Sequence, residues 1–211
     1  MIYPFRSITS FVRPFVVDVL RNWKRYEWTL QGFGMLRAYL FGRELRLHVW
    51  DSRFAVPGVT TIHDHPWHFE SAVVSGSLTN TVYKVHPCTY VETFTLPLAA
   101  IRQTYVEATI VCGPGGRNDP VEMKARGRRV WLASPESSVV AAGKMYRQRS
   151  DEVHCTTYED GTVTLVRREF LQDMEHARVF FKEADGWVSA EPRAATPDEV
   201  DAIVGRALEK L

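Results

Sequence analysis

The segment His63-Asp64-His65-Pro66-Trp67-His68-Phe69-Glu70 gathers three imidazoles and two carboxylates on one short stretch of chain. Imidazole nitrogen is the commonest protein ligand for divalent first-row metals. On an extended strand, residues i and i+2 point to the same side, so His63 and His65 can reach one ion together. The spacing therefore predicts a metal site on strand-like backbone.

A third imidazole lies far along the chain, at His154, directly after the strand-like run Lys144 to Gln148. A histidine-rich turn can also be a hydrogen-bonded surface loop, and the first pair alone does not separate the two interpretations. Apolar, strand-like sequence before and after the pair favours the metal site. The sequence thus predicts that His154 supplies a distant third ligand.

The order of these residues resembles the first motif of the cupin superfamily, which runs Gly, His-x-His, Glu and Gly. The matching residues are Gly58, His63, His65, Glu70 and Gly76, and each glycine gap is one residue short. The segment ending at His154 is similar to the second cupin motif, a turn leading into a lone histidine. Arg149-Ser150-Asp151 stands there in place of the usual Pro-x-Gly.

The resemblance implies an antiparallel double-stranded β-helix of the cupin type, that is, a jelly-roll barrel with the metal inside. A narrower likeness is to bacterial and phage cupin-like proteins of unknown function that share a His-x-His-Pro-Trp segment, and it supplies no substrate. At the level of the fold the likeness covers roughly residues 34–168. It is compatible with a homodimer.

A fourth ligand stays open in the sequence. Counting forward from His65, Glu70 lies where the cupin motif places its glutamate, whereas counting back from Gly76 reaches Phe69. A slip of one residue turns a strand side chain to the opposite face, and His68 is a competing ligand. With Glu70 the site resembles the common cupin set of three histidines and one glutamate. Without it, a three-histidine centre suggests cysteine-dioxygenase-like or related oxygenase chemistry.

Two polar residues alternate on the strand before the third histidine. Tyr146 and Gln148 could turn a hydroxyl and an amide inward, and they are the candidate catalytic residues, with Arg147 on the opposite face. Trp67 and Phe69 are expected to form walls of the pocket. The histidines interpreted as structural or exposed are His48, His86 and His176.

Three neutral imidazoles leave a bound divalent ion doubly positive, with open positions for a ligand. Iron is the metal that we expect, and manganese, nickel or zinc also suit the donor set. The leading hypothesis is a mononuclear metal-binding cupin that acts on a small molecule, with non-haem dioxygenase chemistry favoured over isomerase or hydrolase chemistry. The alternative is a non-catalytic cupin that binds a small ligand or uses its metal structurally.

The composition is that of a folded chain with almost no net charge. Its 211 residues are 45% hydrophobic, which is enough to bury a core. A net charge of +1 gives no general attraction to nucleic acid or membranes, and no apolar stretch reaches the length of a membrane span. The cysteines, Cys88, Cys112 and Cys155, are scattered, which indicates a reducing compartment. The sequence predicts a cytoplasmic protein without a nucleic-acid or membrane partner.

We expect one cupin-like domain over residues 1–211, with a β core over about 34–190. Short β-like runs separated by Gly, Pro, Asn and Asp support this prediction. The expected strands are 35–41, 44–50, 71–78, 81–85, 90–96, 104–111, 129–133, 138–142, 145–148 and 155–158. Two Asp-Gly turns, Asp160-Gly161 and Asp185-Gly186, predict antiparallel hairpins.

Helices are expected at both ends of the core. Apolar residues recur every four positions from Phe11 to Trp23, which predicts a helix over about 10–26 in an N-terminal extension over about 1–33. Near the C-terminus, Thr196 can cap a helix over about 197–210 with Pro197 at its first position.

Overall fold

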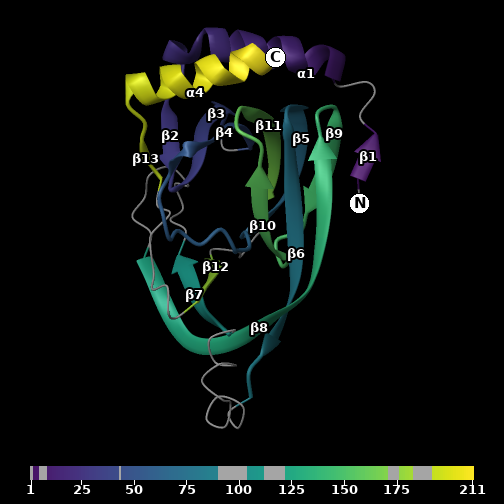
Figure 1. Ribbon diagram of the computed structural model, residues 1–211, viewed down its shortest axis with the longest axis vertical. Helices are drawn as coiled ribbons and strands as arrows, with labels where there is room; N and C mark the ends of the chain where they lie inside the picture. Colours follow the sequence, from purple (N-terminus) through teal and green to yellow (C-terminus); the bar gives the residue numbers. More distant parts are fainter. Residues whose placement is uncertain are drawn as a thin grey trace.

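The computed structural model consists mainly of two antiparallel sheets and two described α-helices, which confirms the all-β prediction (Figure 1). The described residues are 2–4, 9–42, 44–89, 104–111, 122–170, 176–182 and 192–211. The expected strand over 90–96 and the expected Asp185-Gly186 hairpin lie outside these residues.

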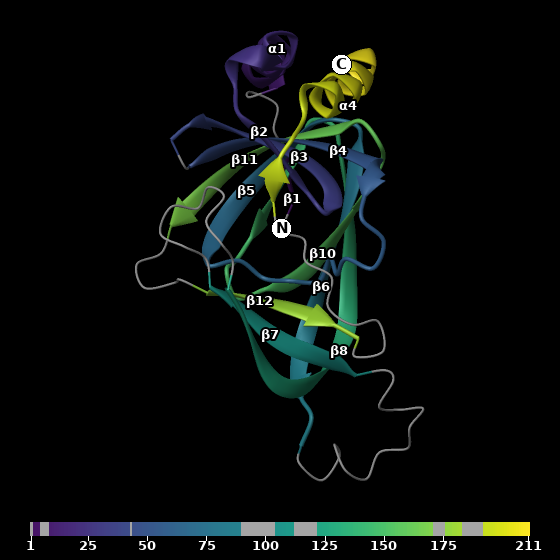
Figure 2. The ribbon, with the colours of Figure 1, turned by 90° about the vertical axis from the view of Figure 1, so that its left-hand side faces the viewer.

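The larger sheet has eight strands and the smaller has five. In spatial order the larger sheet contains β1 (Ile2–Pro4), β9 (Lys144–Gln148), β5 (Trp67–Ser75), β11 (Thr162–Phe170), β4 (Leu45–Ala55), β3 (Phe33–Phe41), β2 (Trp28–Gln31) and β13 (Arg193–Ala194). The smaller sheet contains β10 (Val153–Tyr158), β6 (Ser77–Pro87), β8 (Glu122–Ala141), β7 (Tyr105–Val111) and β12 (His176–Phe181). We call the face of the larger sheet that is turned toward the smaller sheet its inner face (Figure 2).

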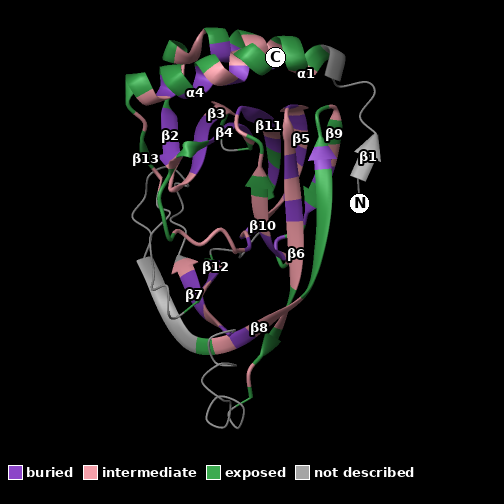
Figure 3. Ribbon diagram, in the orientation of Figure 1, coloured by how far each residue is buried: buried purple, intermediate pink, exposed green. Residues whose placement is uncertain are grey.

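Two helices, α1 (Thr9–Arg21) and α4 (Pro197–Lys210), cover the outer face of the larger sheet (Figure 1). Leu47 and Val49 of β4 point outward and pack with Val19 of α1 and Ile203 of α4 in one buried apolar cluster. Since successive strand residues alternate in direction, the residues between them must point to the inner face. Figure 3 shows buried and intermediate residues alternating along β5, whereas β4 is buried continuously from Arg46 to Asp51 because both of its faces are covered. Neither described helix is both long and apolar enough to cross a membrane.

Helix α4 agrees with its prediction. It begins after Thr196, whose side chain accepts a hydrogen bond from the Glu199 backbone while the Glu199 carboxylate accepts one from the Thr196 backbone. Such a capping box satisfies two backbone donors that would otherwise lack partners at the helix start. The predicted bounds of 197–210 are confirmed.

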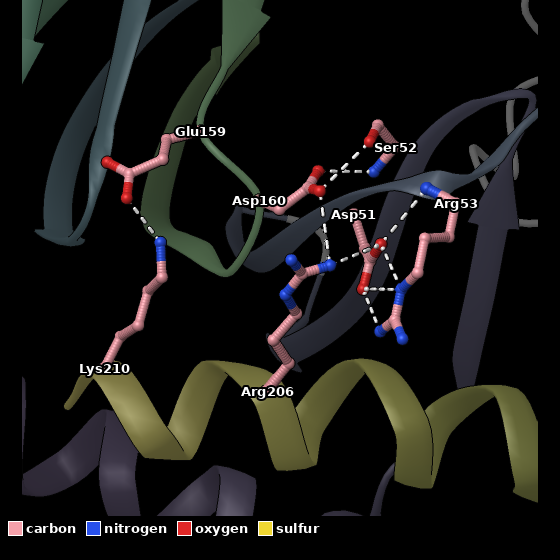
Figure 4. A network of polar contacts seen from close by, with 7 residues as sticks. All are labelled: Asp51, Ser52, Arg53, Glu159, Asp160, Arg206 and Lys210. Carbon is pink, nitrogen blue, oxygen red and sulfur yellow. Dashed lines mark hydrogen bonds and ion pairs between the residues drawn. The ribbon is translucent and has the colours of Figure 1, made fainter.

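Ion pairs connect α4 with β4 and with the turn between β10 and β11 (Figure 4). Arg206 of α4 lies 3.5 Å from the buried carboxylate of Asp51 and 3.2 Å from that of Asp160. The same Asp160 carboxylate accepts hydrogen bonds from the backbone and hydroxyl of Ser52, and Lys210 pairs with Glu159. The network joins the helix to β4 and to the turn before β11.

The turn at Asp160-Gly161 does not form the predicted hairpin. Gly161 has the expected positive φ of 80°, but the strands on its two sides belong to different sheets, because β10 pairs with β6 whereas β11 pairs with β4 and β5. The tight turn is therefore a crossing between sheets. The side-chain contacts of Asp160 with β4 and α4 are tertiary, so the local sequence does not reveal them.

Three further elements differ from their predictions. Strand β2 lies within the expected N-terminal extension, and β1 was not expected at all. Strand β8 runs as one strand through a segment where two were expected. Ser134 adopts a φ of 50° there, next to a register shift in the pairing with β6. The polar Ser-Pro break in the sequence thus forms an irregularity inside the strand, as a β-bulge does.

Gly76 marks the crossing from β5 to β6 and offers a test of this packing. Its φ is 74°, and a Cβ there would lie 2.4 Å from Oγ1 and 2.9 Å from Cα of Thr162. Gly42 has a φ of 58° and no atom within 4 Å of its Cβ position. We expect Gly42→Ala to cost about 1 kcal/mol from backbone strain and Gly76→Ala about 3 kcal/mol because a steric clash is added. Urea unfolding of the two variants measures the difference, and equal losses would contradict it.

Candidate metal centre

Backbone hydrogen bonds hold the first two histidines beside the third. The backbone N–H of His63 donates to the carbonyl of His154 at 2.9 Å, and the N–H of His154 donates back at 2.8 Å. Asp64 turns the other way: its carboxylate accepts from the backbone N–H and the Nε of Arg178 on β12, both at 2.5 Å. Residues 63 to 65 thus lie between β10 and β12, with both imidazoles on the side opposite Asp64.

The three predicted histidines converge. One ligand atom from each of His63, His65 and His154 lies within 4.8 Å of the other two. The Nε2 atoms of His65 and His154 are 3.1 Å apart. Two nitrogens bound to one metal at about 2.1 Å and at a right angle would be about 3.0 Å apart. The pair therefore already has the separation that a shared ion requires.

A chain of side chains behind His154 fixes the orientation of its ring. The Nδ1 of His154 is 2.7 Å from Oδ1 of Asn80, and Nδ2 of Asn80 donates to Oε1 of Gln148 at 2.9 Å. The amide of Gln148 then donates to the carbonyl and the carboxylate of Glu152. Because the amide nitrogen of Asn80 donates to Gln148, the Asn80 oxygen is left as an acceptor facing His154. The proton of the neutral His154 ring therefore lies on Nδ1. Its Nε2 lone pair is left for a metal, as in carboxylate-oriented metal sites.

The ring of His63 is oriented in the same way by backbone. Its Nδ1 is 2.8 Å from the carbonyl of Thr61, which only accepts hydrogen bonds, so this nitrogen carries the proton. The ring of His65 stacks on the indole of Trp67, with centroids 4.1 Å apart. Trp67 therefore forms a wall of the site, as predicted.

The structure places Glu70 and His68 away from these ligands. Glu70 lies on the face of β5 opposite Phe69, and its carboxylate accepts a hydrogen bond from Arg167 at 2.8 Å. Nδ1 of His68 accepts a hydrogen bond from the backbone of Ser150 at 2.9 Å. Phe69 is the residue that faces the site, with its ring centroid 5.2 Å from that of His65. Among the described residues, the geometry assembles three histidines and no carboxylate.

The two candidate catalytic residues are both buried on the inner face, and Arg147 between them is exposed. Gln148 holds Asn80 and so positions His154, which makes it a positioning residue. Tyr146 lies behind Phe69, whose ring centroid is 5.8 Å away, and its hydroxyl is hydrogen-bonded with Ser71 and Thr156. Burial raises the pKa of Tyr146 to about 12. The Tyr146 hydroxyl therefore stays protonated at neutral pH, and it belongs to the buried side chains behind Phe69.

Burial keeps the three imidazoles neutral. Desolvation is the main cause that lowers the pKa of His63, His65 and His154 below the ordinary value, and for His65 the neighbouring imidazoles lower it further. A metal ligand must be deprotonated, so a depressed pKa leaves these rings ready to bind at neutral pH. His48 is also buried with a lowered pKa, whereas His86 and His176 are exposed.

The sequence prediction missed two residues that orient the site, Asn80 and Asp64. A signal existed for Asn80, because asparagine is depleted in strands and here interrupts the run Leu78 to Val82. For Asp64 the alternation with two histidines was visible, but its partner Arg178 is distant in sequence.

Comparison of the chain with protein-family models and with curated proteins gives no match. The geometry therefore carries the functional argument.

The neutral imidazoles make stability depend on pH in the metal-free protein. In the unfolded chain, histidines titrate near pH 6.5; in the folded chain these pKa values are lower, so the unfolded state binds more protons below that pH. The free energy of unfolding should fall as the pH drops from 6.5 to 5.5, by up to about 1.4 kcal/mol per pH unit for each buried histidine. Urea unfolding at a series of pH values should show a shallower slope for His154→Gln than for the wild type. Equal slopes in the two proteins would contradict this account.

Asn80 provides a test of the orienting chain. Asn80→Ala removes the acceptor for His154 Nδ1 without removing a ligand, and we expect metal affinity to fall about 10- to 100-fold. Thr79→Ala, at the adjacent position on the other face of β6, is the control and should bind like the wild type. Competition with a chromophoric chelator measures both dissociation constants. Equal affinities in the two variants would remove Asn80 from the site.

Proposed function

We propose that this chain is a cupin-type protein that binds one divalent metal ion through His63, His65 and His154 and acts on a small molecule. The observation that carries the proposal is the convergence of three imidazoles whose ligand atoms lie within 4.8 Å of one another. Iron is the proposed metal, and the proposed chemistry is that of a non-haem dioxygenase. Manganese, nickel and zinc fit the same donor set.

The connectivity of the strands supports a jelly-roll arrangement. Consecutive strands from β8 to β11 alternate between the smaller and the larger sheet, as do β5 and β6. Gly76 and Gly161, both with positive φ, stand at two of these crossings. A jelly roll is made of two such facing sheets. In this arrangement the metal would lie between the sheets, where inward side chains of distant segments converge.

The number of protein ligands favours a functional metal over a structural one. Structural zinc sites usually have four protein ligands, whereas catalytic sites keep a position open. Three imidazoles converge here, and the two β5 rings that lie against them, those of Trp67 and Phe69, have no atom that could ligate a metal. The histidines are also held by protein contacts, namely the paired backbone hydrogen bonds of His63 and His154. The metal is not required to bring these segments together.

A divalent ion at this site would supply a Lewis acid with open positions for substrate and dioxygen. The protein residues would orient and shield it. Asn80 and Gln148 hold His154 in its ligating tautomer, and Trp67 and Phe69 restrict the access of water on two sides. The described residues offer no carboxylate ligand at this site, so an ion held by the three imidazoles alone would keep its full charge. Such a charge favours an anionic substrate.

Metal content tests the site assignment. The purified protein should contain close to one equivalent of metal, and His63→Ala, His65→Ala and His154→Ala should each lose most of it, because each removes one of three ligands. His68→Ala and Glu70→Gln should retain it, since His68 and Glu70 bond to Ser150 and Arg167 instead. Inductively coupled plasma mass spectrometry on identically prepared proteins measures the outcome. Full occupancy in the double variant His63→Ala/His65→Ala would exclude this site.

Chelation separates the functional metal from the structural alternative. Because backbone and side-chain hydrogen bonds hold the ligands, the metal-free protein should keep its circular dichroism spectrum and unfold cooperatively. A structural-metal protein would lose its fold on chelation. Oxygen uptake by the iron-loaded protein, screened with small organic acids, then distinguishes an oxygenase from a ligand-binding cupin.

A further inference from the structure

The inner face of the larger sheet carries a group of buried arginines next to the histidines. Arg37 of β3, Arg46 of β4 and Arg168 of β11 are 5%, 6% and 4% exposed. They lie on adjacent strands, and Tyr39 and His48 complete the group, because Arg37 pairs in register with His48 and Tyr39 with Arg46. We call these five residues the arginine cluster.

Aromatic rings connect the arginine cluster to the metal centre. The guanidinium carbons of Arg46 and Arg168 are each 5.1 Å from the centroid of Trp67. The same indole stacks on the metal ligand His65 at 4.1 Å. One side chain therefore lies against both groups. A molecule that reached both groups along Trp67 would meet the metal ligands at one end and guanidinium groups at the other.

Two arginines of the cluster, Arg37 and Arg46, have no counterion in the described part of the chain. Arg37 Nε donates to the hydroxyl of Thr29, and Arg46 Nη2 donates to the hydroxyl of Tyr39, and neither arginine pairs with a carboxylate of the described part of the chain. In folded proteins, buried cationic side chains usually have an anionic partner, because burying an unpaired charge costs free energy. The pKa of Arg46 is lowered by its burial first and then by the charges of Arg37 and Arg168.

Two buried polar atoms in the arginine cluster lack a hydrogen-bond partner among the described residues. They are Nε of Arg46 and Nε2 of His48. Native proteins satisfy most buried polar groups, and an exception is a sign of a missing water, ion or ligand. Nε of Arg46 always carries a hydrogen, so its missing partner is an acceptor, and Nε2 of His48 can donate to the same acceptor in one of its two neutral tautomers.

We propose that the arginine cluster binds an oxyanion, a carboxylate or a phosphate, of the molecule that the metal centre acts on. Guanidinium groups match such anions because they donate paired, charge-assisted hydrogen bonds. Arg46 supplies the unpaired Nε–H donor, and Arg37 adds positive charge from the neighbouring strand. Trp67 contacts both Arg46 and His65, so an anion bound by Arg46 would lie near the metal ligands. As a statement about substrate, this rests on the proposed function; as an anion site, it stands alone.

Isothermal titration of the full-length, metal-free protein with inorganic phosphate and with acetate tests the anion site. Ionic strength is held constant with chloride, which screens nonspecific attraction. At least one of the two anions should bind saturably, and the tighter one identifies the oxyanion as phosphate or carboxylate. Arg46→Met should bind it at least tenfold more weakly. Arg147→Met, an exposed arginine on the outer side of β9, should bind it like the wild type.

Two further variants keep the test decisive if Arg46→Met does not fold. Arg46→Lys keeps the charge but loses the paired donors, and Arg37→Met removes charge from the adjacent strand; both should weaken binding severalfold. Absence of saturable binding in the wild type, or binding that these substitutions leave unchanged, overturns the proposal. Metal titration of the same proteins separates the two claims. Metal binding without anion binding refutes only the arginine cluster, and anion binding without metal binding refutes only the proposed metal function.

Discussion

The reciprocal backbone hydrogen bonds between His63 and His154 are the interaction on which the site depends. They join a segment that precedes β5 to β10, which lies far along the chain and in the other sheet. With these backbones in register, side-chain direction follows from strand geometry: His63 and His65 share one side and Asp64 takes the other, where Arg178 holds it. The convergence of the three imidazoles is thus a consequence of backbone pairing. The side chains behind them refine the orientation.

A second constraint is the division of the larger sheet into two chemically different faces. The outer face is apolar and is covered by α1 and α4, with Leu47 and Val49 as examples. The inner face of the same strand carries Arg46 and His48, both buried. The apolar cluster under the helices supplies burial that stabilises the fold, so the inner face can retain charged groups that oppose folding. This division is typical of a site whose polar residues are kept for a ligand.

The sequence predicted what local pattern controls. The alternation of His63 and His65, the capping residues before α4 and the inward positions of Tyr146 and Gln148 all follow from residue spacing, and the structure agrees with them. Predictions that needed tertiary partners failed or stayed open. Asp160-Gly161 was expected to form a hairpin, but it turns between two sheets. Glu70 could be placed only once the register of β5 was known, and that register turns it toward Arg167.

The arginine cluster likewise could not be predicted from the local sequence pattern. Arg46 alternates with Leu45 and Leu47 as an exposed strand residue would, yet in the folded chain its side chain is buried against Tyr39 and Trp67 of two other strands. Asn80 likewise gains its role from Gln148 and His154, which belong to two other strands. Spacing identified the ligands, whereas the groups that orient them and give the site its charge required the assembled sheets.

X-ray absorption at the metal edge of the loaded, full-length protein tests the central claim most directly, because it reports the ligands themselves. Three imidazole nitrogens at about 2.0–2.2 Å, with the multiple scattering of histidine rings, are the predicted result. In His154→Ala the imidazole count should fall by one. A metal without imidazole scattering, or an imidazole count that His154→Ala leaves unchanged, would show that the three histidines do not share an ion.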